Sequence, residues 1–496
     1  MKTRLLSAFL ALLTLLVPLV TMVSCGETAA PETNVVTEPV QTGGAETVPE
    51  ETELLPDLPD DLDLNGKTVT FVNATRVDSD VYILAVTEAT GDVVQDAVYD
   101  RNLAVKSRFN CEFDFITQKA GDLSNYIKKA VLAGANDFDA ISGIQYLVIQ
   151  LLADGCFMNM ASAPYIDLSK PWWANEYNRE MMINDSGVYF LSGDITLGHI
   201  GRQSCIYANK RIWEALYGSP DALYNTVKDG AWTIEALDKA SEGAYADLNG
   251  NGKADLGDQF GCLSDITSRT DHFTYDAGLR CTKRDSDGRP VIIFNNERTA
   301  AFAEWIHHFL VTSDYVFIDD ASDAHLVEMF KNGEALFSLG FFHQAEMLRD
   351  MEDDYAIIPY PKYDETQDTY LSLVHDHSIV FSLPATCTVF DEISAILEAM
   401  AYEGYRTVTP AYFEIALKNK YTRDSGELPM QILDDIRVHS TTDFAYVYNY
   451  ALNGVALLMR KITRSASPDF ASKYAEVEEA AQVKLDELVT MLTEIR

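Results

Sequence analysis

The segment Lys67–Asn73 reads KTVTFVN and opens the pattern that decides the fold. Its β-branched and aromatic residues, placed after a glycine turn, predict a strand. Apolar residues then recur at helical spacing through Val93–Phe109, and Cys111–Ile116 alternates as a second strand. A helix over Leu123–Leu132 and a strand over Phe138–Ser142 follow. Strand and helix alternating with short connections predict an α/β fold, in which helices cover a parallel sheet.

The alternation continues less regularly through the rest of the chain. Further strands are expected at Ser204–Asn209, Ala335–Leu339, Tyr355–Pro359 and Ser378–Leu383, and helices at Lys210–Leu216, Ala300–Leu310 and Glu392–Tyr402. Thr233 is placed to cap a helix that begins at the next residue. The segment Pro468–Ile495 predicts one long amphipathic helix. About 430 residues are too many for one compact core, so we expect two lobes.

The first 25 residues have the pattern of an export signal. Lys2 and Arg4 precede an apolar run from Leu5 to Val23, and Met22-Val-Ser-Cys25 resembles the lipobox of bacterial lipoproteins. A transmembrane anchor is the alternative, but Ser24 followed by Cys25 at the end of the run favours cleavage. We therefore expect a signal peptide over residues 1–25, lipidation of Cys25, and a protein tethered to the outer face of the cell membrane.

Residues 26–64 are rich in Glu, Thr, Pro and Val. They carry eleven Asp or Glu residues and no Lys or Arg. Such a segment has too little apolar surface to offset the entropy of ordering, so it predicts a disordered acidic linker. The whole chain has a formal charge of −38, which argues against binding to nucleic acid.

A candidate metal loop lies at Asp247–Phe260, which reads DLNGNGKADLGDQF. Ca²⁺ requires six to eight oxygen ligands and a tight turn, which oxygens at alternate positions and a glycine at the sixth position supply. The backbone carbonyl of the seventh residue would add one ligand, and an aspartate stands at the twelfth position in place of the usual glutamate. A polar turn without an ion is the alternative. The predicted ligands of a structural Ca²⁺ are Asp247, Asn249, Asn251, Lys253, Asp255 and Asp258.

Cysteine spacing excludes the usual zinc and redox motifs. Besides Cys25 there are six cysteines, and none forms a CxxC pair. Disulfides form in exported proteins, and Cys262 with Cys281 is the nearest pair. Six buried thiols are equally consistent with the pattern.

His375-Asp376-His377 is a second candidate for metal binding or acid–base catalysis. On an extended segment both histidines would face the same side. A catalytic zinc normally has a third protein ligand, and no motif such as HExxH supplies one. A loop pair without a metal is therefore the expectation.

The order of several short segments resembles one family. These segments are Lys67–Asn73, Tyr99–Lys106, Ala133-Gly134 with Asp137-Phe-Asp139, Tyr207-Ala-Asn-Lys210, Gly230-Ala-Trp-Thr233, the loop Asp247–Gly261, and Ile358-Pro-Tyr-Pro361. Over residues 66–460 this order is similar to that of the extracellular solute-binding proteins of bacterial ABC importers, of the large carbohydrate-binding type.

The resemblance implies a two-lobed periplasmic-binding-protein-like fold with discontinuous domains joined by hinge strands. The first lobe would comprise residues 66–194 plus 351–405, and the second residues 199–350 plus 406–496. Such a protein is not an enzyme: it captures a small solute, here an oligosaccharide, and delivers it to an ABC permease. An extracellular carbohydrate-active enzyme or a surface glycan-docking protein is the alternative.

Candidate ligand-binding residues lie where strands of each lobe end toward a cleft, since sugars bind between aromatic rings and polar hydrogen-bonding groups. They are Ser142, Gln145, Trp172, Trp173, Asp194, Tyr207, Phe341 and Phe342. Because Trp172 and Trp173 are adjacent, one of them is expected near solvent or ligand. Core packing is the alternative for each aromatic residue. The absence of an evident basic clamp favours a neutral solute.

Overall fold

The structure is a computed structural model that describes residues 54–75, 84–182, 187–413 and 426–494. The predicted signal peptide, Cys25 and residues 26–53 of the predicted linker lie outside the described residues. Residues from Leu55 to Arg496 form one compact unit that contains two main sheets. No helix of the described part is long and apolar enough to cross a membrane.

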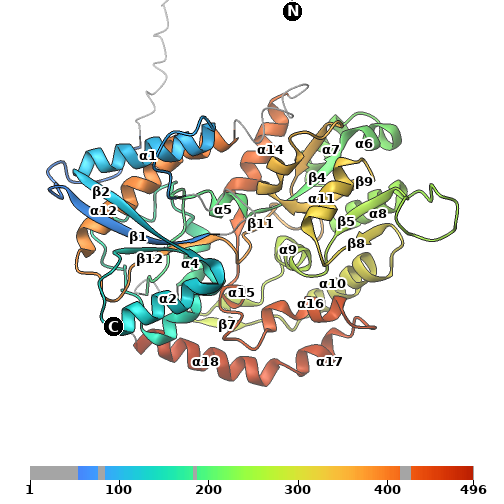
Figure 1. Ribbon diagram of the computed structural model, residues 1–496. Helices are drawn as coiled ribbons and strands as arrows, with labels where there is room; N and C mark the ends of the chain where they lie inside the picture. Colours follow the sequence, from blue (N-terminus) through green and yellow to red (C-terminus); the bar gives the residue numbers. More distant parts are fainter. Residues whose placement is uncertain (1–53, 76–83, 183–186, 414–425, 495–496) are drawn as a thin grey trace, which may run out of the picture. The chain divides into compact units, whose positions relative to one another are not determined.

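The first sheet has the predicted parallel arrangement (Figure 1). It forms from β1 (Lys67–Thr75), α1 (Val93–Phe109), β2 (Cys111–Lys119), α2 (Ala120–Leu132) and β3 (Ala140–Ile144). The strands lie in the order β12-β3-β1-β2, and β1 is parallel to both β2 and β3. The fourth strand, β12 (Ile379–Ser382), pairs antiparallel with β3 and closes this edge of the sheet.

Helix α1 illustrates how local sequence sets an element. Asp92 caps its first turn by accepting hydrogen bonds from the backbone N–H groups of Val94 and Gln95. Asn110 ends it in the left-handed conformation, with φ of 47°. Buried Val98 and Val105 face the core, and α12 (Phe390–Glu403) packs beside them.

The second sheet contains five strands in the order β10-β4-β9-β5-β8. The strands are β4 (Ser204–Asn209), β5 (Phe260–Ser264), β8 (Val316–Ile318), β9 (Ala335–Phe341) and β10 (Tyr355–Ile358). Strand β5 is parallel to β8 and β9, whereas β4 runs antiparallel to β9, with Ser204 opposite Phe341. The start of β4 therefore lies at the same edge as the carboxyl end of β9.

The other elements connect and cover these two sheets. Among the described residues they include α3 (Gln145–Val148), α4 (Asn175–Met181), α5 (Gly198–Gly201), α6 (Lys210–Tyr217), α7 (Asp221–Lys228), α8 (Ile234–Ala244), α9 (Ser268–Asp276), α10 (Glu297–His307), α11 (Asp323–Lys331), α14 (Glu427–Val438), α15 (Phe444–Val447), α16 (Leu458–Thr463), and the short strands β6 (Thr282–Arg284), β7 (Pro290–Ile292), β11 (Ser372–Leu373) and β13 (Ser440–Thr441).

Three boundaries differ from the sequence-based expectation. Residues 355–358 were expected with the first lobe, but β10 pairs with β4 of the five-stranded sheet. The single helix expected over 468–495 is two helices, α17 (Phe470–Ala475) and α18 (Glu478–Glu494), because buried Val477 turns into the core between them. The rest of the two-lobe division stays a prediction.

The third difference concerns the end of the acidic linker. Residues 54–64 were expected to be disordered, but Leu58 and Leu64 are buried, and the Leu64 N–H donates to the Phe109 carbonyl at 2.8 Å. The average composition of residues 26–64 is polar. That average did not reveal that these two leucines pack against the end of α1.

The cysteines of the described part are free and buried. They are Cys111, Cys156, Cys205, Cys262, Cys281 and Cys387. The question that spacing left open is therefore settled in favour of thiols in the core, and Cys262 is not bonded to Cys281.

Candidate functional site

A cavity of about 280 Å³ lies where strands of the five-stranded sheet end. Its walls come from the start of β4, the turn after β5, the start of α11 after β8, the end of β9, the segment between β11 and β12, and the C-terminal region. The lining residues are Arg202, Thr267, Ser268, Asp323, Phe341, His375, Asp376, His377, Tyr450 and Arg460. In α/β folds, ligands bind at the carboxyl ends of the strands, so this cavity is the candidate site.

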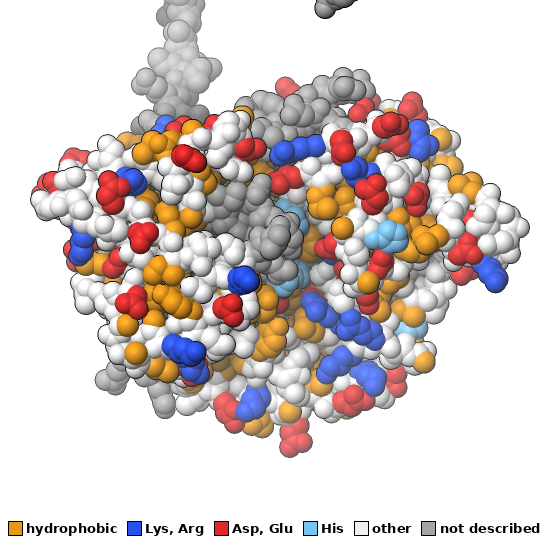
Figure 2. Space-filling model, viewed as in Figure 1, with side chains coloured by type: hydrophobic (Ala, Val, Ile, Leu, Met, Phe, Trp, Pro, Cys, Tyr) orange, Lys and Arg blue, Asp and Glu red, His pale blue; other side chains and the backbone are white. Residues whose placement is uncertain are grey.

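The first sheet also contributes to this region. Tyr146 lies in α3, the short helix that directly follows β3. The Tyr146 ring packs on His377 with centroids 4.8 Å apart, and it stacks on Tyr450 at 6.3 Å and 27°. Figure 2 shows histidine and basic side chains around a hollow near the middle of one face. Groups that follow strands of both sheets therefore meet at one cavity.

Phe341 forms the centre of the cavity's inner wall. The guanidinium of Arg269 lies 4.8 Å from its ring centroid and that of Arg202 lies 5.9 Å away. The imidazoles of His272 and His375 contact the same ring edge-to-face, at 4.7 and 5.4 Å. The cavity therefore combines one apolar ring with a shell of cationic and imidazole groups.

The carboxylates around the cavity balance most of this positive charge. Arg269 pairs with Asp265 at 2.7 Å and with Asp323 at 2.9 Å. Burial by itself would raise the pKa of Asp265, but Arg269 and hydrogen bonds from Thr267 bring it down to about 2. Asp265 is therefore ionised at neutral pH, and the pair is a fixed part of the wall.

The histidine nearest the sheet is held neutral. Burial, reinforced by His377 and His272, lowers the pKa of His375 well below its ordinary value. Its Nδ1 accepts the backbone N–H of His377 at 3.2 Å. At neutral pH this imidazole contributes a hydrogen-bonding group without a charge.

The expectation of no basic clamp was wrong for this cavity, because Arg202 and Arg460 both line it. These two residues are separated by more than 250 positions in the sequence, so no cluster was visible there. A signal existed for the first one, since Arg202 lies two residues before the predicted strand Ser204–Asn209.

Of the eight candidate ligand-binding residues, Phe341 lines this cavity. Tyr207 and Phe342 lie behind it: the Tyr207 hydroxyl donates to the Phe341 carbonyl at 2.7 Å, and Phe342 is buried. Ser142 is buried within β3, and buried Gln145 accepts a hydrogen bond from the hydroxyl of Tyr177. Solute contact by any of them stays a prediction.

One of Trp172 and Trp173 was expected near solvent or ligand; exposure to solvent is wrong for both, and contact with a ligand stays a prediction. Both are buried, at 1% and 3% exposure, because the carboxylate of Glu398 on α12 accepts both indole N–H groups at 2.8 Å. Burial raises the pKa of Glu398, and the two indoles partly oppose this. A distant acid thus satisfies both indoles, which sequence adjacency alone does not reveal.

Trp173 and Asp194 line a different cavity, of about 370 Å³, beside His199, Tyr405 and Arg437. Burial raises the pKa of Asp194 to about 7, against the effect of Arg437. Burial also lowers the pKa of His199 to about 3. The predicted ligand-binding residues therefore divide between two places.

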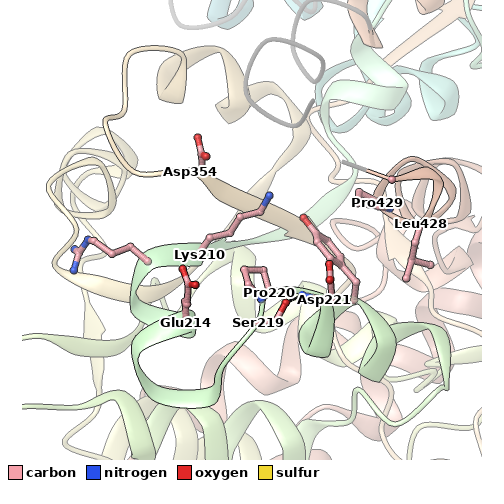
Figure 3. Close-up of a pocket in the computed structure, with 11 residues that line it drawn as sticks. Lys210, Glu214, Ser219, Pro220, Asp221, Asp354, Leu428 and Pro429 are labelled. Carbon is pink, nitrogen blue, oxygen red and sulfur yellow. Dashed lines mark hydrogen bonds between the residues drawn. The ribbon is translucent and has the colours of Figure 1, made fainter. Parts of the chain in front are cut away.

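A third cavity, of about 570 Å³, lies between α6, α7 and the start of α14. Lys210 and Glu214 project from α6, and Leu428 and Pro429 belong to α14 on the opposite wall (Figure 3). It is bordered by Gly426, next to residues outside the described part. It brings together none of the predicted site residues.

The predicted calcium loop has the turns that its glycines allow. Gly250 and Gly252 have φ of 71° and 72°, and their N–H groups donate to the carboxylate of Asp247 at 2.6 and 2.8 Å. The carboxylate of Asp255 accepts the side-chain amides of Asn249 and Asn251, each at 2.8 Å.

The end of the loop is anchored to the fold. Asp258 is 2% exposed and accepts the N–H groups of Leu248 and Asp255 at 3.2 Å. The loop is therefore closed by its own carboxylates, and this donor set of carboxylate, amide and carbonyl oxygens suits Ca²⁺. Lys253 is exposed, as expected for a residue that offers only its backbone carbonyl.

No protein-family model matches the chain, and no curated protein matches its sequence. Solved structures do match. The GacH receptor of Streptomyces glaucescens is 12% identical, with 87% of this chain and 100% of that chain covered and a TM-score of 0.51. The maltose/maltodextrin-binding domain MalE from Bdellovibrio bacteriovorus, bound to maltotriose, is 14% identical, with coverage of 85% and 100% and a TM-score of 0.52.

UgpB from Mycobacterium tuberculosis, in complex with glycerophosphocholine, is also 14% identical, with coverage of 85% and 99% and a TM-score of 0.54. The fold is that of the ABC solute-binding proteins. The predicted α/β, two-lobed fold class is thereby confirmed. At these identities the likeness establishes the solute-binding-protein fold, and the solute has to be argued from the cavity itself.

Proposed function

We propose that this chain is the extracellular solute-binding receptor of an ABC importer, which captures an oligosaccharide by lobe closure and passes it to the permease. The observation that carries the proposal is the cavity at the carboxyl ends of β5, β8 and β9, where Tyr146 of α3, which follows β3 of the first sheet, meets His377 and Tyr450. In this fold, a MalE domain has been solved with maltotriose bound.

The cavity has the two kinds of surface that a sugar requires. Phe341 and Tyr450 offer aromatic rings to the apolar face of a pyranose. Arg202 and Arg460 can donate to hydroxyl oxygens, while Asp376 can accept from hydroxyl hydrogens. Closure of the lobes would exclude water and strengthen each of these hydrogen bonds.

Lipidation of Cys25 and a structural Ca²⁺ in the Asp247–Asp258 loop complete the proposal. The anchor would hold the receptor at the outer face of the membrane, close to its permease. The ion would be held by Asp247, Asn249, Asn251, Asp255, Asp258 and the Lys253 carbonyl, stapling the end of α8 to β5 without touching the solute.

The test is a thermal-shift screen of the chain from Gly26 onward, with Ca²⁺ present, against a panel of oligosaccharides. A solute at a hundred times its dissociation constant should stabilise the folded state by about 2.7 kcal/mol. The expected result is a clear upward shift with one class of sugar, and intact sugar recovered afterwards. No shift with any sugar would overturn the carbohydrate assignment, and recovered cleavage products would make the protein an enzyme.

A further inference from the structure

Three consecutive side chains of one segment turn toward the same cavity. His375, Asp376 and His377 lie between β11 and β12, and all three line it. The Nδ1 atom of His375 lies 3.1 Å from Oδ1 of Asp376, and Nε2 of His377 lies 3.9 Å from the same oxygen. One ligand atom from each residue lies within 4.8 Å of the other two.

These separations are close to those around a small divalent ion. Zinc binds nitrogen and oxygen at about 2.0–2.2 Å, so two ligands of a tetrahedral ion lie about 3.3 Å apart. The pair formed by His375 and Asp376 is already near that spacing. The Nε2 atom of His377 lies farther from this spacing, so the His377 side chain would have to move toward Asp376. This side chain is 29% exposed, so a change of its rotamer can bring the nitrogen closer without disturbing the core.

The first ring of the cluster is already oriented. His375 is packed edge-to-face against Phe341 and against His272, with centroids 5.4 and 5.9 Å apart. Its Nδ1 accepts the backbone N–H of His377 at 3.2 Å, so the single lone pair of this nitrogen is engaged there, and a metal bound through Nδ1 would take the place of this hydrogen bond.

Asp376 is the carboxylate of the cluster. Arg460 faces the cluster, but it is paired with Asp271, and Arg269 is paired with Asp265 and Asp323. Arg202 also lines the cavity, and its guanidinium lies over the Phe341 ring. An ion bound through two imidazoles and one carboxylate would therefore gain a counter-charge from Asp376.

We propose that His375, Asp376 and His377 form a binding site for a divalent transition-metal ion such as Zn²⁺, with its open coordination positions toward the cavity. Two imidazoles and a carboxylate select a borderline ion and not Ca²⁺, which prefers oxygen ligands alone. The site is thus distinct in chemistry from the Asp247–Asp258 loop. It does not depend on the identity of the solute.

The test is a titration of the metal-free chain with Zn²⁺ in the presence of excess Ca²⁺, which occupies the oxygen-only loop. Co²⁺ replaces Zn²⁺ in a parallel titration, because its visible absorption spectrum reports the coordination geometry. The expected result is one Zn²⁺ per chain and a Co²⁺ spectrum of four or five ligands that include nitrogen. Absence of stoichiometric binding to the unmutated chain would overturn the proposal.

Variants identify the ligands. His377→Ala and Asp376→Asn should each weaken Zn²⁺ binding by roughly 100-fold or more, since loss of a direct ligand exceeds the effect of an outer-shell change. His308→Ala removes an exposed histidine that is not among the residues lining the cavity, and it should leave the affinity unchanged. Both ligand variants are checked by circular dichroism. Equal Zn²⁺ affinity in His377→Ala and the unmutated chain would contradict the assignment.

Discussion

Arg460 forms a two-pronged ion pair with Asp271, in which the Arg460 Nε donates to Oδ1 at 2.8 Å and Nη2 donates to Oδ2. Asp271 is 1% exposed, so its carboxylate has been removed from water, and Arg460 is its cationic partner beside a hydrogen bond from Tyr446. The pair ties α16 near the C-terminus to α9 in the second sheet's region. It also places the guanidinium at the wall of the candidate site.

Arg460→Ala is expected to destabilise the fold, because it leaves the Asp271 carboxylate buried without its cation. Breaking such a pair costs about 3–5 kcal/mol, and the lower value applies here because the Arg460 side chain is 22% exposed. Urea unfolding followed by circular dichroism measures the change. Arg464→Ala is the matched control: this side chain is 52% exposed and lies 3.8 Å from Asp320, so its loss should change stability by less than about 0.5 kcal/mol. Equal effects of the two substitutions would contradict the role given to the pair.

Asp194 should make the stability of the protein depend on pH. Its folded-state pKa is raised to about 7 by burial, whereas an unfolded aspartate titrates near 4. Between these values the folded state binds a proton that the unfolded state releases, so this contribution is fully present below pH 4 and is lost as the pH rises to 7. The full contribution is at most roughly 4 kcal/mol.

The comparison of Asp194→Asn with the unmutated chain isolates this effect from that of the other carboxylates. The difference in unfolding free energy between the two proteins should shift in favour of the unmutated chain as the pH falls from 7 to 4. Asp486→Asn, at an exposed position of α18, is the control for replacing an aspartate away from this buried site. A pH-independent difference for Asp194→Asn would show that Asp194 stays charged in the fold.

Local sequence was sufficient for many elements of the fold. The predicted bounds of α1 and β4 match the structure, since Asp92 and Asn110 mark the ends of the helix and β-branched and aromatic residues mark the strand. Thr233 caps α8 as predicted, by accepting from the Ala236 N–H at 3.3 Å. Where tertiary packing sets the boundary, as at Val477 between α17 and α18, periodicity in the sequence gave no signal.

The candidate site was less accessible to sequence reasoning. Phe341 was predicted because it follows a predicted strand, whereas Tyr450, in a turn, and Arg460, in α16, reach the cavity only through the folded chain. His375-Asp376-His377 was expected to bind no metal, because the sequence showed no third ligand. Asp376, the residue between the two histidines, offers that carboxylate in the structure. Alternation along an extended strand would have pointed it away.

The Asp247–Asp258 loop should make the protein's stability depend on calcium. Binding of Ca²⁺ to the folded state alone, at a hundred times the dissociation constant, adds about 2.7 kcal/mol. Asp247→Asn replaces one of the proposed charged ligands and should abolish most of this calcium-dependent gain, while leaving the stability in a chelator nearly unchanged. Thermal unfolding with and without Ca²⁺ measures both quantities. Asp287→Asn, in the separate turn between β6 and β7, is the control and should retain the gain. A calcium effect of the same size in both variants would place the ion elsewhere.

Tyr450 provides the sharpest test of where the solute lies. Its ring lines the cavity and stacks on Tyr146, yet the side chain is 61% exposed, so it contributes little to the core. If a sugar ring packs against it, Tyr450→Ala should weaken binding by about 0.5–1.5 kcal/mol, up to roughly tenfold in the dissociation constant. The free energy of unfolding should change by no more than about 0.5 kcal/mol.

Isothermal titration calorimetry with the sugar found in the thermal-shift screen measures this change in affinity. Leu132→Ala, which removes an equally exposed apolar side chain at the end of α2, should bind the sugar as the unmutated chain does. A parallel substitution at Trp173 distinguishes the two cavities, because that indole borders the cavity beside Asp194 and not the one beside Phe341. If Tyr450→Ala binds normally while a correctly folded Trp173→Phe does not, the solute occupies the cavity beside Asp194. That result would also remove the solute from the neighbourhood of His375, Asp376 and His377, whose metal binding is measured without it.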